Sequence, residues 1–222
     1  MNKVAILVDG GFYRRVAQSK WGNKGAEERA NEVIRYCKRH LSQNANGEKD
    51  ELYRIFYYDC PPINKKIFHP LLNKTIDLSK SELCGWMNIF LNEMKRKRKV
   101  ALRLGSLSEI EANYILTYDA VKKLCRKSLS VEDLENKHFT LTTIQKGVDM
   151  KIGVDIASMA YKKQVDKIVL ISGDSDFVPA AKLARREGID FVLDAMHQHI
   201  KPELSEHIDG LRSCFGKNDT KI

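Results

Sequence analysis

The chain has 222 residues, of which 43% are hydrophobic and 30% are charged, a composition typical of a folded globular protein. Its 38 lysines and arginines outnumber its 29 aspartates and glutamates, and the formal net charge of +9 favours an anionic partner such as nucleic acid. There is no apolar run of the roughly 20 residues that a membrane helix needs, no secretory signal at the start, and no metal-binding or disulfide spacing among the five cysteines. These features predict a cytoplasmic protein that makes no membrane contact.

Strand and helix patterns alternate along the chain. The first strand is predicted over 3–9, where five apolar residues precede Asp9 and two glycines. Further strands are predicted over 51–59, 100–106, 138–145, 166–172 and 189–195, and helices over 26–41, 81–95, 149–163, 177–188 and 201–208. This alternation, with strands apolar on both faces, predicts an α/β fold with a mostly parallel central sheet.

Residues 107–137 fit the alternation poorly, because they are polar and only partly helical. They are predicted to form an insertion in a single domain that spans 1–222. No Pro/Gly/Ser-rich linker or internal repeat divides the chain. A homo-oligomer is compatible with the sequence, which contains no signal that decides the oligomeric state.

Aspartates lie at the carboxyl ends of several predicted strands or in the helix that follows one. Functional crevices of open parallel sheets lie outside the carboxyl ends of the strands. If the strands in question are neighbours, these side chains therefore converge at one edge of the sheet. The five aspartates in such positions are Asp9, Asp149, Asp155, Asp174 and Asp176.

Asp155 gives the strongest argument for a metal ion. On a helix it shares a face with Ile152, Ile156 and Met159, which we expect to pack against the sheet. An unpaired carboxylate there would cost several kcal/mol, and Mg²⁺ or Mn²⁺ is a suitable partner because both prefer hard oxygen ligands. The alternative is a buried carboxylate that accepts a hydrogen bond from a serine or tyrosine.

The other aspartates also have ordinary structural interpretations. Asp176 or Ser175 could cap the following helix, and Asp9 could belong to a turn before its two glycines. Asp149 could be an acid that the helix dipole favours in a first turn. What argues for a common site is that all of them fall at the carboxyl ends of strands.

Four stretches together resemble one known family: "VAILVDGGF", "KGVDMKIGVDIASMA", "ISGDSDFVPAAKLARREG" and "ELSEHIDGLRSCF". They are similar to NYN-domain proteins, a branch of the PIN-like nuclease superfamily, over the first strand and most of 140–215. The resemblance implies a three-layer α/β/α sandwich. It also implies a metal-dependent endoribonuclease that uses Mg²⁺ or Mn²⁺ to hydrolyse RNA phosphodiesters.

The resemblance extends to individual residues. The catalytic acids that it implies are Asp9, Asp149, Asp155 and Asp174, with Asp176 as an addition. Of these, Asp9, Asp155 and Asp174 are the expected metal ligands, and Asp149 or Asp176 would orient the attacking water. Many members have an asparagine three residues after the first aspartate, where this chain has Phe12. That departure favours the alternative function, a nucleic-acid-binding module of the same fold with weak or no catalysis.

Basic and hydroxyl residues near the acids are candidates for binding single-stranded or looped RNA. The substrate-binding candidates are Lys146, Ser172, Ser175 and Arg14. "KRKRK" over 95–99 and the basic residues of 122–127 would be either phosphate tracks or solvated helix surfaces. A flap-type deoxyribonuclease would share the carboxylate chemistry. An aspartyl-phosphate phosphatase fits poorly, because no second aspartate stands two residues after Asp9.

Overall fold

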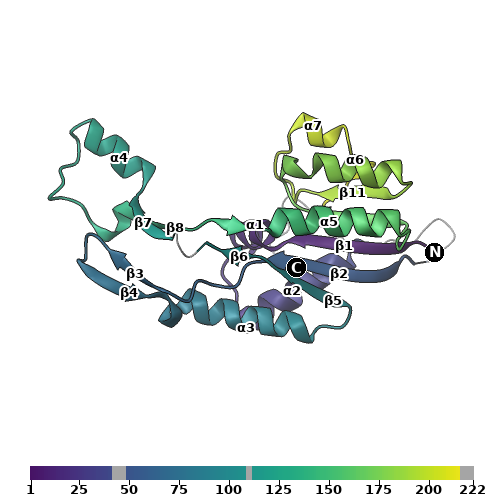
Figure 1. Ribbon diagram of the computed structural model, residues 1–222, viewed down its shortest axis with the longest axis horizontal. Coiled ribbons are helices and arrows are strands. Elements are labelled where there is room, and N and C mark those ends of the chain that lie inside the picture. Colours follow the sequence, from purple (N-terminus) through teal and green to yellow (C-terminus); the bar gives the residue numbers. More distant parts are fainter. Residues whose placement is uncertain (42–48, 109–111, 216–222) are drawn as a thin grey trace.

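The computed structural model describes residues 1–41, 49–108 and 112–215. Its centre is a six-stranded, all-parallel sheet with the strand order β12-β11-β10-β1-β2-β5 (Figure 1). The strands are β1 (Lys3–Asp9), β2 (Glu51–Asp59), β5 (Val100–Leu104), β10 (Lys167–Ile171), β11 (Asp190–Asp194) and β12 (Gly210–Leu211). No helix in these described ranges is long and apolar enough to cross a bilayer.

Helices cover both faces of the sheet. One layer contains α1 (Gly10–Trp21), α2 (Ala26–Lys38) and α3 (Glu82–Arg96), and the other contains α5 (Val148–Tyr161), α6 (Val178–Arg186) and α7 (Pro202–Ser205). Successive side chains of a strand point to opposite faces, so Ile6 of β1 packs in the first layer and Leu7 in the second. The predicted PIN-like α/β/α sandwich is confirmed.

Strand β1 lies at the centre of the sheet, and its five apolar residues are 0% exposed. It pairs in parallel with β2 on one side, where Asp9 lies opposite Tyr58. It pairs with β10 on the other side, where Val8 lies opposite Ile171. The carboxyl ends of these three strands therefore meet side by side, as the sequence argument requires.

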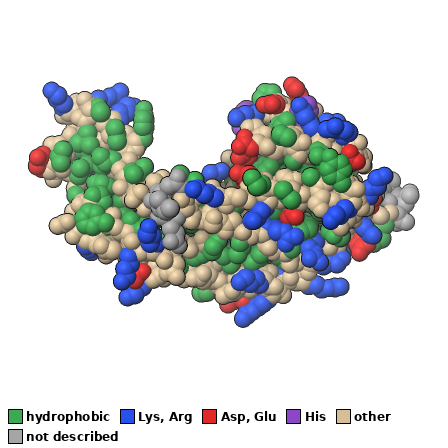
Figure 2. All heavy atoms as spheres, viewed as in Figure 1, with side chains coloured by type: hydrophobic (Ala, Val, Ile, Leu, Met, Phe, Trp, Pro, Cys, Tyr) green, Lys and Arg blue, Asp and Glu red, His purple; other side chains and the backbone are tan. Residues whose placement is uncertain are grey.

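An arm projects beyond the carboxyl edge of the sheet (Figure 1). It consists of the described residues of 61–80 and 106–146, and most of 107–137 lies in it, although 109–111 fall outside the described residues. Its elements are β3 (Lys66–His69), β4 (Lys74–Asp77), η1 (Leu78–Lys80), β6 (Ser106–Leu107), β7 (Asn113–Leu116), α4 (Tyr118–Cys125), η2 (Asn136–His138), β8 (Phe139–Thr142) and β9 (Gln145–Lys146). The rings of His69 and Tyr114, 4.3 Å apart, join its two chain segments. A hollow separates the arm from the lobe that carries α6 and α7 (Figure 2).

The prediction that 138–145 forms a strand of the central sheet is wrong. Within this range β8 pairs antiparallel with β7 in the arm, and Gln145 belongs to β9, which pairs with β6, so neither strand joins the central sheet. The physical reason is visible in "FTLT", where apolar and polar residues alternate. Alternation is typical of a half-exposed antiparallel strand, whereas a strand buried on both faces needs a continuous apolar run.

Candidate active site

Asp9 lies where β1 ends and α1 begins directly. One carboxylate oxygen, Oδ1, accepts a hydrogen bond from the backbone N–H of Phe12 at 3.0 Å, so Asp9 is the N-cap of α1. The other, Oδ2, accepts one from the hydroxyl of Ser172 at 3.3 Å. Burial raises the pKa of Asp9, and the nearby charge of Asp174 raises it further. This carboxylate is therefore oriented by two protein donors and lies close to a second acid.

The resemblance to NYN-domain proteins implies an asparagine at position 12, and here the ring of Phe12 is a core residue, only 8% exposed. A Cβ added at Gly173 would lie 2.9 Å from the ring, so the loop after β10 closes tightly over it. The group that holds Asp9 is the backbone N–H of Phe12, which does not depend on the side chain. The departure at this position therefore leaves the orientation of Asp9 intact.

The loop after β10 brings two more acids to the same edge. The buried hydroxyl of Ser172 accepts a hydrogen bond from the backbone N–H of Asp174 at 3.3 Å while it donates to Asp9. Oδ1 of Asp174 accepts one from the N–H of Asp176 at 3.0 Å and caps the short helix η3 (Ser175–Phe177). Asp174 thus caps η3. The predicted cap by Asp176 or Ser175 concerned the next helix, α6, whose N-cap is Phe177 with no side-chain capping bond. Asp174 and Asp176 both remain exposed.

Asp149 approaches the group from another element, the first turn of α5. Its side chain is reachable from solvent, yet partial loss of water raises its pKa, and the charges of Asp9, Asp174 and Asp176 raise it further. The four carboxylates therefore lie within one another's electrostatic field. We call Asp9, Asp149, Asp174 and Asp176 the acidic edge.

The acidic edge lacks an ion-paired basic side chain among the described residues. Across the described ranges, none of its four carboxylates forms an ion pair, although the more distant Arg15 lowers the pKa of Asp9. Repelling carboxylates without a protein cation, together with the hydroxyl of Ser172, form a set of hard oxygen donors. The chemistry of these donors suits Mg²⁺ or Mn²⁺. In the described part of the chain, however, no three of these carboxylates lie within 4.8 Å of one another, so an ion would have to draw them together.

Asp155 lies apart from the acidic edge and has protein partners. Its Oδ2 accepts a hydrogen bond from the hydroxyl of Tyr58 at 2.8 Å and forms an ion pair with Nε of Arg103 at 2.9 Å. The structure thus supports the alternative of a satisfied carboxylate bonded to a tyrosine, rather than one that needs a cation. Both partners come from strands of the central sheet, Tyr58 from β2 and Arg103 from β5.

Asp59 is a buried acid at this edge that the sequence analysis missed. It ends β2 as Asp9 ends β1, is 1% exposed, and accepts a hydrogen bond from the backbone N–H of Cys60. It forms an ion pair with Arg14, one of the predicted substrate-binding residues. A Cβ at Gly10 would lie 2.5 Å from Oδ2 of Asp59, so only glycine fits there. The signal available in the sequence was an aspartate that ends a buried strand.

The remaining predicted binding residues lie at different distances from the acidic edge. Ser175 belongs to η3, between Asp174 and Asp176, and Lys146 is exposed in β9 at the base of the arm. The basic run 95–99 lies instead where β5 begins, at the opposite edge of the sheet. There Lys97 contacts Glu93 and Lys99 contacts Glu51. This run is therefore a solvated helix end rather than a phosphate track to these acids.

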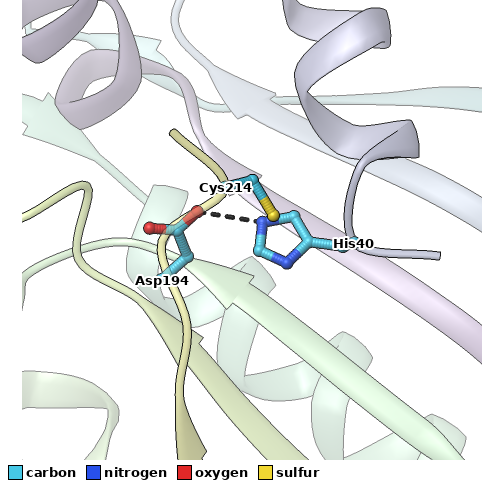
Figure 3. Close-up of side chains that lie close together, drawn as sticks. All are labelled: His40, Asp194 and Cys214. Atoms are coloured by element: carbon cyan, nitrogen blue, oxygen red, sulfur yellow. Dashed lines mark hydrogen bonds and ion pairs between the residues drawn. The ribbon is translucent and has the colours of Figure 1, made fainter. Parts of the chain in front are cut away.

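A second cluster of metal-ligand residue types lies deeper in the protein, formed by His40, Asp194 and Cys214 (Figure 3). Oδ2 of Asp194 accepts from Tyr36 at 2.5 Å and lies 2.9 Å from Nε2 of His40. Its Oδ1 accepts a hydrogen bond from the N–H of Met196 and one from the hydroxyl of Ser213. Burial raises the pKa of Cys214 to about 12, so the thiol stays protonated at neutral pH. Protein donors thus occupy the carboxylate, and the cluster is a structural hydrogen-bond network.

This parallel α/β/α sandwich, with carboxylates at the carboxyl edge of its sheet, has the architecture of the PIN-like, nuclease-like fold that the NYN family has. The NYN domain family matches residues 86–211, more than half of the chain, and the protein belongs to this family. A solved protein of unknown function from Vibrio parahaemolyticus RIMD 2210633 aligns over 95% of this chain and 91% of its own, with 15% identity and a TM-score of 0.44. No curated protein matches the chain.

Proposed function

We propose that the protein is a metal-dependent endoribonuclease that hydrolyses RNA phosphodiesters at the acidic edge. The observation that carries the proposal is that four carboxylates from three segments, the end of β1, the first turn of α5 and the loop with η3, lie close enough to affect one another's pKa, without an ion pair from the described part of the protein. Such a group would repel a phosphodiester unless cations reverse the local charge. The formal charge of +9 supports an anionic polymer as the substrate.

Asp9 and Asp174 would hold Mg²⁺ or Mn²⁺, with Asp149 in place of the displaced Asp155. When bound, the ion would neutralise the phosphate and lower the pKa of a bound water. Phe12 N–H and the Ser172 hydroxyl fix the Asp9 carboxylate in advance, so no reorientation is needed when the substrate arrives. Asp176, exposed at the end of the group, would orient the attacking water.

A second candidate function is an RNA-binding module with weak catalysis. It is favoured by the engagement of Asp155, an expected metal ligand, with Arg103 and Tyr58. It is also favoured by Phe12, which puts a packed ring where many family members have an amide. The two functions share the fold and the substrate, and they differ in whether a bond is cleaved.

The test is cleavage of single-stranded RNA, hairpin RNA and single-stranded DNA by the wild type and by Asp174→Asn. Each substrate is incubated with Mg²⁺, with Mn²⁺ or with EDTA. We expect cleavage of RNA that needs the metal and falls about a hundredfold or more in the variant, because one ligand is weakened. The matched control is Asp190→Asn, which removes a carboxylate at the opposite edge of the sheet, where Asp190 pairs with Lys167.

Three results would point elsewhere. Tight RNA binding without cleavage under any metal condition would favour the binding module. Cleavage of DNA alone would indicate a deoxyribonuclease. Equal loss of cleavage in Asp174→Asn and Asp190→Asn would show that the acidic edge has no special part in the reaction.

A further inference from the structure

A pocket of about 300 Å³ lies beside the acidic edge, between α3, the end of β2 and the base of the arm. Its walls are mostly apolar and come from the body and the arm alike. They include Cys84 and Met87 of α3 and Leu107 and Leu141 of the arm. The pocket therefore lies at the junction between the body and the arm.

The pocket and the acidic edge share a border. A Cβ placed on Gly11 would lie 3.5 Å from Oδ1 of Asp9 and 3.7 Å from Nε2 of Gln145. The carboxylate of Asp9 and the amide of Gln145 therefore flank the same point of the backbone, and Gln145 also lines the pocket. A group bound in the pocket near Gln145 would therefore lie close to a group bound at Asp9.

The polar groups of the pocket are few. The Gln145 amide offers a donor and an acceptor at the entrance, and Thr143 offers a hydroxyl there. The guanidinium of Arg14, which also lines the pocket, is held by the buried carboxylate of Asp59. Apolar walls with a few oriented polar groups are typical of small-molecule sites, and the volume is at the low end of their range, roughly 300–1,000 Å³.

We propose that this pocket receives one unpaired nucleobase of the RNA, next to the phosphate bound at the acidic edge. A nucleobase has apolar faces that suit the walls and hydrogen-bonding edges that suit Gln145 and Arg14. The base must leave its stack to enter, so paired RNA is excluded unless the base is extruded. This inference rests on the proposed function, and it adds that the base beside the cleaved bond affects the rate.

Two measurements test the pocket. The first is the cleavage rate of four single-stranded RNAs that differ at one base within an otherwise uniform sequence. The second is binding of the four nucleoside 5′-monophosphates to the metal-free protein, followed by ligand-observed NMR. The pocket is filled by Thr143→Trp, which starts from an exposed residue, and its amide is removed by Gln145→Ala. The matched control, Thr140→Trp, adds the same ring to an exposed position of β8 that does not line the pocket.

In the wild type we expect rates that differ at least tenfold between the best and the worst base. Thr143→Trp should reduce the rate for the best base about tenfold and weaken nucleotide binding, while Thr140→Trp behaves as the wild type. Gln145→Ala should reduce the difference in cleavage rate between the best and the worst base. Melting temperatures of all three variants show whether each is folded. If Thr143→Trp does not fold, the test of the pocket depends on Gln145→Ala.

The outcomes separate this inference from the proposed function. If the wild type cleaves all four RNAs equally and Thr143→Trp and Gln145→Ala do not differ from it, the pocket assignment is overturned and the nuclease stands. Nucleotide binding that Thr143→Trp blocks, in a protein that cleaves nothing, supports the pocket and refutes the nuclease. Absence of both cleavage and nucleotide binding refutes both.

Discussion

Asp194 and the carboxylates of the acidic edge lie at the same edge of the sheet, but they differ in how many protein groups bind them. Asp194 ends β11 and is 0% exposed, and its two oxygens have four protein partners. Asp9 ends β1 and has two donors, and the other members of the acidic edge have no ion pair in the part of the chain that the structure describes. A position at a strand end therefore does not by itself define a catalytic acid. The distinguishing property is whether the protein satisfies the charge.

The largest effect on stability should come from the satisfied carboxylate. Asp194→Ala leaves the buried His40 and Tyr36 and the partly buried Ser213 without their acceptor, and we expect a loss of about 3–5 kcal/mol in the free energy of unfolding. Urea denaturation at pH 7 measures it. Asp190→Ala, whose carboxylate is 45% exposed, should cost about 1 kcal/mol or less. Similar losses in the two variants would contradict the comparison.

Asp155 is intermediate between Asp194 and the acidic edge, because two protein groups bind one of its oxygens. Asp155→Asn should lower the free energy of unfolding by about 1 kcal/mol, because Tyr58 and the partly exposed Arg103 lose a charged acceptor. We expect its RNA cleavage to stay within a few-fold of the wild type, unlike that of Asp174→Asn. Cleavage assays and urea denaturation on both variants check this. Loss of cleavage at unchanged stability would restore Asp155 as a metal ligand.

The smallest effect should have the opposite sign. The pKa of Asp149 is raised in the folded protein, so folding disfavours its charged form, and Asp149→Asn should stabilise the metal-free protein at pH 7 by up to about 0.5 kcal/mol. The gain should shrink as the pH falls through the raised pKa and vanish below the ordinary value of 3.8, where the carboxyl is protonated in both states. Thermal melts from pH 7 to pH 3 measure it.

Added Mg²⁺ provides the companion measurement. It should raise the melting temperature of the wild type, because an ion that binds only the folded state stabilises it, and raise that of Asp149→Asn less. A variant that is less stable than the wild type at pH 7 without metal would show that Asp149 makes a favourable contact instead.

Most of the sandwich could be predicted from the sequence, because its strands are continuous apolar runs. β1, β2, β10 and β11 each follow from such a run together with the residue that ends it. Helix α1 was missed because two glycines open it, and what begins it is the capping bond to Asp9, a contact that no periodicity reveals. The arm was missed in part because the β3–β4 hairpin packs against β7, about 45 residues later in the chain.

The sequence could predict only those residues of the site that stand at the end of a strand or soon after it. Asp9, Asp174 and Asp176 follow β1 and β10, and the adjacency of these strands brings them together. Asp155 was placed with them because its helix face is apolar, but Arg103 comes from a strand whose neighbours the sequence does not specify. The order of strands in a sheet is a tertiary property, and the partner of each charge depends on it.

The central place of β1 also sets the order in which the sheet can be completed during synthesis. β1 ends at Asp9, yet one of its two neighbours begins only at Lys167. A ribosome-bound chain that stops short of β10 leaves one side of β1 unpaired and contains neither Asp174 nor Asp176. Translation itself therefore delays assembly of the acidic edge until β10 and the loop after it have left the ribosome.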